Sequence, residues 1–270
     1  MSRVRLDLLL TKRGLAESRV KAQALIMAGQ VSVDGQPAGK AGQLVDDSAA
    51  VSVRQRPPYV SRGGYKLACA LDRFGVAVAG LVALDVGAST GGFTDVLLQR
   101  GARRVYAVDV GRGQLHWRLR SDPHVVVLDR TNIRYVESLP EQAQLATVDV
   151  SFISLRLVVP AVHRLLAPGS SMIVLVKPQF EAGRGEVGRG GIVRSVEVHR
   201  GVLAEFAGWL TDHSLGLRDL IVSPVRGAAG NVEFLAWLTP ISDDLASAQG
   251  LIERTLEEVP LSKHSEGSDS

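Results

Sequence analysis

A glycine-rich segment has the residue types of a nucleotide-binding turn. The segment DVGASTGGFT follows an expected strand and opens an expected helix, so its backbone N–H groups can approach a ligand closely. It lacks GxGxxG spacing, and the chain has no GxxxxGK[ST] motif, which makes a nicotinamide or ATP site the weaker interpretation. The residues expected to meet a cofactor in this segment are Asp85, Gly87, Ala88, Ser89, Gly91, Gly92 and Phe93.

Acidic residues stand at the carboxyl ends of the strands that follow this turn. Asp109 ends the strand RRVYAVDV, 24 residues after Asp85, where a carboxylate can accept both ribose hydroxyls of an adenosyl group. Asp129 and Arg130 end the next strand, in a position to meet the adenine, and Asp149 ends a fourth. Each acid alone could be a helix cap or turn residue. Together they predict an acidic site, which favours a sulfonium cation over a pyrophosphate, so we expect S-adenosyl-L-methionine as the cofactor.

Two lysines and two carboxylates could supply proton-transfer chemistry. Lys66 precedes the first strand, Lys177 ends the apolar strand IVLV, and Glu233 lies in NVEFLAWL. A ribose hydroxyl is a poor nucleophile until a positioned base takes its proton, and a desolvated lysine beside another cation can be that base. We therefore expect Lys177 as the base, Lys66 as the neighbouring cation, and Asp149 and Glu233 as groups that orient them. A solvated charge at a strand end is the alternative for each lysine.

The sequence after the fourth strand bears on which atom is methylated. It reads DVSF, whereas amino-methylating enzymes of this fold carry [ND]PP[YF] there, and carbon-5 methylation of pyrimidines needs a cysteine nucleophile at its own site. Cys69, the single cysteine, lies on an expected helix, where it reads as an apolar residue. Methylation of a base remains the alternative reaction.

Strands and helices alternate through most of the chain, which is typical of a doubly wound, Rossmann-like α/β sheet with helices on both faces. The last two expected strands are separated by too few residues for a crossover helix, so they must be antiparallel. We expect this methyltransferase-like domain over residues 62–262, followed by a polar tail at 263–270. The expected strands cover residues 82–86, 104–109, 125–128, 145–149, 171–176, 217–223 and 232–238.

The first 56 residues read as a separate small α+β unit. Leu6, Leu9 and Leu10 recur at helical spacing up to Gly14, and Ser18 offers an N-cap to a second helix. The period then changes to two, and a tight Asp-Gly turn follows at residues 34–35. Two prolines in residues 57–61 favour an extended linker.

Charge is distributed unevenly between these parts. Residues 1–66 carry a formal balance of +6, whereas the remainder carries −3 of the total +3. The basic front end fits a polyanionic partner, although a merely solvated surface would also account for it. The longest apolar stretch, residues 76–84, is too short to span a bilayer and the N-terminus has no apolar signal region, so we expect a cytoplasmic protein. One cysteine permits neither an intramolecular disulfide nor a thiolate-clustered metal site, and we expect no metal.

The front segment RLDLLLTKRGLAESRVKAQALIMAGQVSVDGQPA resembles the S4 RNA-binding domain over about residues 3–53. In such a domain, two short helices present cations to phosphates and position the RNA without reading its bases. The residues expected to do so here are Arg5, Lys12, Arg13, Arg19 and Lys21.

The motifs SRGGYKLACAL, LDVGASTGGFTDVLL, VDVGRGQL, VDVSFISL, LVKPQFE and GNVEF resemble the hemolysin A (TlyA) family, S4-fronted relatives of FtsJ-type 2′-O-methyltransferases. The resemblance runs nearly the full length and implies 2′-O-methylation of cytidine in 16S or 23S ribosomal RNA, with ribosomal RNA or ribosomal subunits as partners. It implies a Lys-Asp-Lys-Glu catalytic set at Lys66, Asp149, Lys177 and Glu233. It also implies that Gly87, Gly91, Gly92, Phe93, Asp109 and Asp129 surround the cofactor.

One departure from the family pattern, the role of one loop and two other functions stay open. The linker reads PPYV where some family members have RAWV, and the glycine-rich stretch 181–191 is either a lid over RNA or an ordinary loop. A ribosome-assembly factor with a silent methyltransferase fold would bind RNA without transferring a methyl group. A membrane-lysing toxin would need an amphipathic or spanning segment and an export signal, and we find neither in the sequence.

Overall fold

A computed structural model describes residues 3–54, 57–183, 185–240 and 245–259. The chain divides into two compact units, residues 1–58 and 59–270, so the division falls inside the predicted linker. The predicted end of the second domain at 262 and the predicted tail at 263–270 lie outside the described residues. Each unit is described by itself below.

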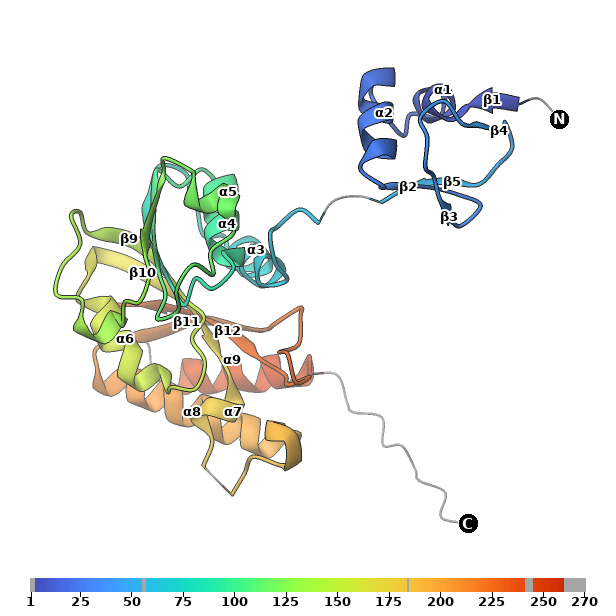
Figure 1. The fold of residues 1–270 in the computed structure, drawn as a ribbon. Helices are drawn as coiled ribbons and strands as arrows, with labels where there is room; N and C mark the ends of the chain where they lie inside the picture. Colours follow the sequence, from blue (N-terminus) through green and yellow to red (C-terminus); the bar gives the residue numbers. More distant parts are fainter. Residues whose placement is uncertain (1–2, 55–56, 184, 241–244, 260–270) are drawn as a thin grey trace, which may run out of the picture. The chain divides into compact units, whose positions relative to one another are not determined.

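The first unit is a small α+β structure (Figure 1). Strand β1 (Arg3–Arg5) pairs with β4 (Leu44–Asp46), and β2 (Val31–Val33) lies between β3 (Gln36–Pro37) and β5 (Val51–Val53). Helices α1 (Leu6–Lys12) and α2 (Arg19–Met27) bury the leucines and isoleucine of their inner faces against these strands.

The local signals in this unit act as predicted. Ser18 Oγ accepts a hydrogen bond from the backbone N–H of Lys21 at 3.2 Å, which caps α2. Asp34 and Gly35 both have positive φ, 49° and 79°, as the two-residue turn between β2 and β3 requires. The pairing of β1 with β4 was not predicted, because three-residue strands leave too short a pattern to detect.

The second unit is a seven-stranded sheet with helices on both faces (Figure 1). The strand order is β11-β12-β10-β9-β6-β7-β8, and β12 runs antiparallel to both of its neighbours. The strands are β6 (Val82–Val86), β7 (Arg104–Val108), β8 (Val125–Leu128), β9 (Ala143–Val148), β10 (Leu166–Val176), β11 (Gly216–Val222) and β12 (Phe234–Thr239).

Alternation along the strands decides what each face packs against. In β6, Val82 and Leu84 join the core under one set of helices, and Ala83 joins the core under the other. Helices α3 (Gly63–Phe74) and α4 (Gly92–Gln99) cover the Ala83 face. The opposite face is covered by α6 (Leu155–His163), α8 (Val196–Asp212) and α9 (Leu245–Glu257).

Shorter elements complete the unit: α5 (Trp117–Arg120), η1 (Ile133–Tyr135), α7 (Pro178–Glu181) and η2 (Arg189–Gly191). The predicted α/β class, the mostly parallel sheet and the antiparallel final strand are confirmed. Because β12 is reversed, its first residues lie at the sheet edge where the parallel strands end.

Candidate active site

The four predicted catalytic residues come from separate elements that meet at the carboxyl edge of the sheet. Asp149 follows β9, Lys177 follows β10, and Lys66 lies in the second turn of α3. Glu233 stands immediately before the reversed strand β12. The structure therefore brings together residues that are up to 167 positions apart in the chain.

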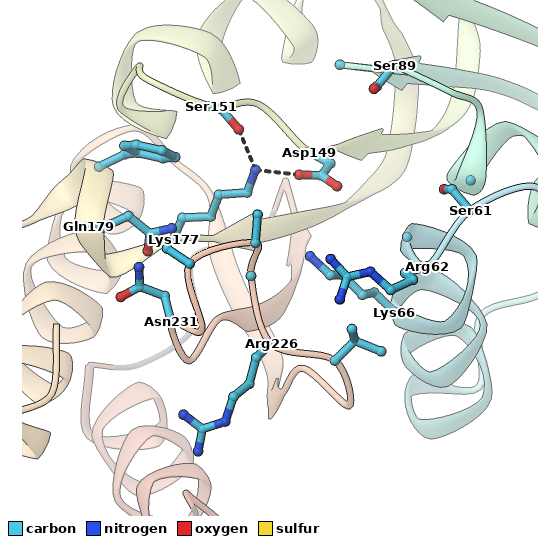
Figure 2. Close-up of a pocket in the computed structure, with 18 of the residues that line it drawn as sticks. Ser61, Arg62, Lys66, Ser89, Asp149, Ser151, Lys177, Gln179, Arg226 and Asn231 are labelled. Atoms are coloured by element: carbon cyan, nitrogen blue, oxygen red, sulfur yellow. Dashed lines mark hydrogen bonds and ion pairs between the residues drawn. The ribbon is translucent and has the colours of Figure 1, made fainter. Parts of the chain in front are cut away.

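These side chains form two ion pairs. Lys177 Nζ lies 2.7 Å from Asp149 Oδ1 and donates to Ser151 Oγ at 2.8 Å, and Figure 2 shows both contacts as dashed lines. Lys66 Nζ lies 2.5 Å from Glu233 Oε2. Both lysines and Glu233 are buried. Each ammonium group thus has its own carboxylate, which offsets the cost of removing the charges from water.

One cavity of about 590 Å³ joins the lysines to the glycine turn. Lys66, Asp149 and Lys177 line it together with Gly87–Thr90, Gly92 and Phe93, and Figure 2 shows the lysines and Asp149 around it. Its other walls come from Ser61–Gly63, the 225–231 loop, and Gly190 and Gly191. A bound cofactor at the turn and a base at Lys177 would therefore share one cavity.

The glycines of the turn are required by close approach. Gly87 has φ 83°, and a Cβ there would clash with the carbonyl oxygen of Asp149. A Cβ at Gly92 would lie 2.8 Å from the backbone nitrogen of Gly64, where α4 begins against α3. Bare backbone at this turn also leaves room for a ligand in the cavity beside it, which fits the adenosyl and amino-acid groups of S-adenosylmethionine.

Asp109 is the carboxylate that shapes the turn from the neighbouring strand. It accepts hydrogen bonds from the backbone N–H groups of Ser89 at 2.8 Å and Gly111 at 2.7 Å. These bonds hold the loop after β6 beside the loop after β7. Contact between Asp109 and the cofactor ribose stays a prediction.

Asp85 lies beneath the turn and has no exposed surface. Its oxygens accept from Thr94 Oγ1 at 2.6 Å and Thr147 Oγ1 at 3.0 Å. Burial raises the pKa of Asp85 to about 6, the nearby Asp149 charge adds to that, and the two hydroxyls oppose it. The side chain therefore braces β6 against α4 and β9, and its predicted contact with the cofactor stays a prediction.

Asp129 and Arg130 follow β8 and are fixed by their own neighbours. Asp129 Oδ2 pairs with Arg120 at 2.5 Å and accepts from the Gly113 N–H at 3.2 Å, and chiefly the Arg120 bond lowers its pKa. Arg130 has φ 53°, and its N–H donates to the carbonyl of Gly111. The 109–113 and 129–131 segments are thus joined. The adenine contact remains a prediction for both residues.

Sequence reasoning assigned no role to Ser151, Phe152 or Glu181. Phe152 lines the cavity, is 90% exposed and has a positive φ of 63°. Its ring centroid lies 4.9 Å from the ring centroid of Phe180. The sequence could have indicated Phe152, because DVSF has an aromatic residue at the position where the [ND]PP[YF] motif has one.

Glu181 joins the two segments that carry the Lys177–Asp149 pair. It accepts from Ser154 Oγ at 2.7 Å and from the Leu155 N–H at 2.8 Å, at the start of α6. Burial raises its pKa, and these two bonds oppose that. The residues after β9 and those after β10 are therefore fixed to each other, and no local sequence pattern indicates this bond.

The five predicted RNA-binding cations of the first unit all have partners inside that unit. The buried carboxylate of Asp7 accepts from Arg5 at 2.9 Å and from Arg19 at 3.0 Å. Arg13 donates to backbone carbonyls of residues 47 and 49. Lys12 pairs with Asp47 at 3.0 Å, and Lys21 pairs with Glu17 at 2.6 Å, both at the surface. Their contact with RNA stays a prediction.

The part of the chain that the structure describes contains no helix long and apolar enough to cross a bilayer. Within the same residues, no group of three or more His, Cys, Asp or Glu side chains could hold a metal ion.

The fold and the cavity define the class of protein: a methyltransferase with a Rossmann-like sheet, for which S-adenosyl-L-methionine is the methyl donor. A model of the FtsJ-like methyltransferase family matches residues 59–239, and a model of the S4 domain matches residues 4–51. The chain belongs to the hemolysin A (TlyA) family, and the relatives below are 39–46% identical to it over most of its length.

Named relatives cover nearly the whole chain. The 16S/23S rRNA (cytidine-2′-O)-methyltransferase TlyA of Mycobacterium tuberculosis is 46% identical over 271 residues, covering 96% of this chain and 99% of the relative. Hemolysin A of Brachyspira hyodysenteriae is 39% identical over 236 residues, covering 86% and 98%. A solved structure from Streptococcus thermophilus, described as a candidate hemolysin, superposes with TM-score 0.71 at 41% identity, covering 96% and 97%.

Proposed function

We propose that this protein transfers a methyl group from S-adenosyl-L-methionine to the 2′-hydroxyl of a cytidine in ribosomal RNA, in the cytoplasm. The observation that carries the proposal is the Lys177–Asp149 pair in the cavity that also contains the glycine turn. The substrate assignment is supported by the relative from Mycobacterium tuberculosis, which is named for cytidine-2′-O methylation of 16S and 23S rRNA.

Methyl transfer to a hydroxyl releases one proton, and the chain's own residues must receive it. Lys177 Nζ is positioned to take the hydroxyl proton as the new O–C bond forms. Asp149 lies 2.7 Å from the same nitrogen and can accept a proton from Lys177 in turn. An ammonium nitrogen has no lone pair, so a protonated Lys177 must give one proton to Asp149 before or as it takes the hydroxyl proton. The released proton then rests on the Asp149 carboxyl group, and the pair acts as a short relay.

The second ion pair serves position and charge. Lys66 lines the cavity and is held by Glu233 at 2.5 Å, so its ammonium group has little freedom. A fixed cation beside the hydroxyl favours the alkoxide character that develops during transfer. Bound S-adenosyl-L-methionine supplies the electrophilic methyl group, and the glycine turn would hold it.

The S4 unit would anchor the RNA. Its surface pairs Lys12–Asp47 and Lys21–Glu17 are solvent-exposed, so a phosphate can replace the carboxylate at little cost. Asp7 holds Arg5 and Arg19 through some of their N–H groups and leaves other donors of each guanidinium for phosphates. The unit can therefore bind phosphates without reading bases.

The test is transfer of labelled methyl groups to each purified ribosomal subunit, followed by digestion to nucleosides. We expect label in 2′-O-methylcytidine. Label on the cytosine ring would establish base methylation instead, and absence of label from every ribosomal particle would favour an RNA-binding protein without methyl transfer.

A further inference from the structure

Beside the active-site cavity, the segment 188–194, here called the wall segment, meets the 225–231 loop that precedes β12. Asn231 joins them and is only 1% exposed. Its side-chain oxygen accepts from the Val193 N–H at 2.9 Å, and its side-chain nitrogen donates to the Gly191 carbonyl at 2.8 Å. In the described part of the chain, Asn231 makes both side-chain bonds between the wall segment and this loop.

The wall segment separates two empty spaces. Gly190 and Gly191 line the active-site cavity, and Asn231 is among the residues around it (Figure 2). Residues 192–194 line a second cavity of about 250 Å³, which His199 of α8 also lines. Close packing is what normally fixes a segment of a protein interior. The wall segment borders both cavities, so it depends for its position on the buried side chain of Val193, which is 2% exposed, and on the hydrogen bonds of Asn231.

The backbone of the wall segment adds to this dependence. Gly190 and Gly191 have φ values of 75° and 72°, and no atom lies within 4 Å of where a Cβ would stand on either. Neither residue therefore contributes a side chain that could anchor the segment.

Asn231 also lies two residues before Glu233, in the short segment that leads into β12, and both side chains are buried. The Gly227 N–H donates to the Asn231 carbonyl at 3.0 Å, and a Cβ on Gly227 would lie 2.5 Å from Glu233 Oε1. One short stretch therefore places the Glu233–Lys66 pair and the wall opposite it.

We propose that Asn231 is a positioning residue that holds the wall segment at the cavity, where the segment contacts the target RNA. It acts on the affinity for the target RNA, and leaves cofactor affinity and the proton relay unchanged. This inference rests on the proposed function for its substrate class. It assigns the glycine-rich stretch the role of a tethered wall of the RNA site.

The test compares Asn231→Ala and Asn231→Asp with the wild-type chain. Asn231→Ala removes both bonds, and we expect the KM for ribosomal RNA to rise about ten-fold, with kcat changed less than about three-fold. The dissociation constant for S-adenosylmethionine, measured by calorimetry, should not change. Amide hydrogen exchange at Val193 should accelerate in Asn231→Ala. In Asn231→Asp it should stay slow, because a carboxylate oxygen still accepts that N–H, while the KM rises through repulsion of the Gly191 carbonyl.

Thr255→Val is the matched control. Thr255 is equally buried at 1% exposure, on α9, and its hydroxyl donates to the carbonyls of Leu220 and Leu251, away from the cavity. We expect it to lower the unfolding midpoint without altering the KM for RNA or exchange at Val193.

A fall in kcat with unchanged KM, or unaltered exchange at Val193 in Asn231→Ala, would overturn the proposal. So would a rise in KM of the same size in Thr255→Val. If the wild-type chain methylates no ribosomal RNA, the proposed function fails, whereas exchange at Val193 still decides whether Asn231 holds the wall segment.

Discussion

Two fully buried aspartates, one in each unit, meet opposite electrostatic surroundings. Asp7 accepts hydrogen bonds from Arg5, Arg19 and Gln23, and chiefly the Arg5 bond holds its pKa well below its usual range. Asp85 accepts from two threonine hydroxyls, and burial raises its pKa to about 6. The lack of exposed surface therefore does not by itself fix the pKa of a carboxyl group, because charged donors and the depth of burial also contribute.

The difference between these two aspartates parallels a difference in how the basic side chains of each unit are paired. In the first unit, arginines surround a carboxylate and order the starts of α1 and α2. In the second, the buried lysines have one carboxylate each and face an open cavity. We expect loss of a charged group to reduce stability in the first unit and activity in the second.

The largest effect should come from Lys177→Ala. We expect methyl transfer to fall at least about a thousand-fold, because the hydroxyl loses its proton acceptor, while cofactor and RNA affinities stay near wild type. Single-turnover transfer and calorimetry measure the two properties. Arg100→Ala, which removes a cation paired with Asp72 at 2.7 Å outside the cavity, is the control and should retain activity. Wild-type turnover in Lys177→Ala would rule out the relay.

A smaller effect, on stability alone, should follow from Asp7→Asn. Because folding lowers the pKa of Asp7, its carboxylate stabilises the folded state fully at pH values above 3.8, its pKa in the unfolded chain. This stabilisation is lost as the pH falls below 3.8. At pH 7 the variant should therefore destabilise the first unit by about 2 kcal/mol, as expected for hydrogen bonds to a charged group. Hydrogen exchange in residues 3–54 during a denaturant titration would measure this. Equal protection in variant and wild type would show that the arginines do not depend on Asp7.

The smallest effect, with the opposite sign, should follow from Asp85→Asn. The folded pKa near 6 exceeds the unfolded 3.8, so the folded state holds its proton more tightly, and wild-type stability declines as pH rises through 6. The asparagine cannot ionise and can still bond both hydroxyls. We expect the cofactor-free variant to be more stable than wild type by about 1 kcal/mol at pH 8, with no advantage at pH 4.5. If Asp85→Asn instead lost as much stability at pH 8 as Asp7→Asn, the predicted difference between the two aspartates would be wrong.

Much of the catalytic unit could be predicted because strand periodicity and strand ends are local signals. The seven strands lie within a few residues of their predicted ranges, apart from an earlier start of β10, and the acids and lysines at their ends meet at one edge. The pairing could not be predicted. Asp149 and Glu233 were expected to orient the two lysines, but the sequence did not assign either carboxylate to a lysine, because the Lys66–Glu233 pair depends on the position of β12 between β10 and β11.

Side-chain direction explains what else the sequence did not reveal. Asp85 alternates with Leu84 and Val86, so it points with Ala83 towards α4, where Thr94 meets it. In the first unit, helical spacing correctly predicted that Arg19 and Lys21 are exposed. The same spacing did not indicate that Arg19 would donate a hydrogen bond to Asp7, twelve residues earlier in the chain.

The place of β12 also has a consequence for the order in which the protein becomes active. β12 is made after every other strand, yet it lies between β10 and β11 and brings in Glu233. A chain still emerging from the ribosome can complete the glycine turn and the Lys177–Asp149 pair long before it contains Glu233. Synthesis itself therefore delays the complete set of four proposed catalytic residues until β12, the last of the described strands, is inserted. An unfinished chain that lacks β12 cannot assemble this set while it is still attached to the ribosome.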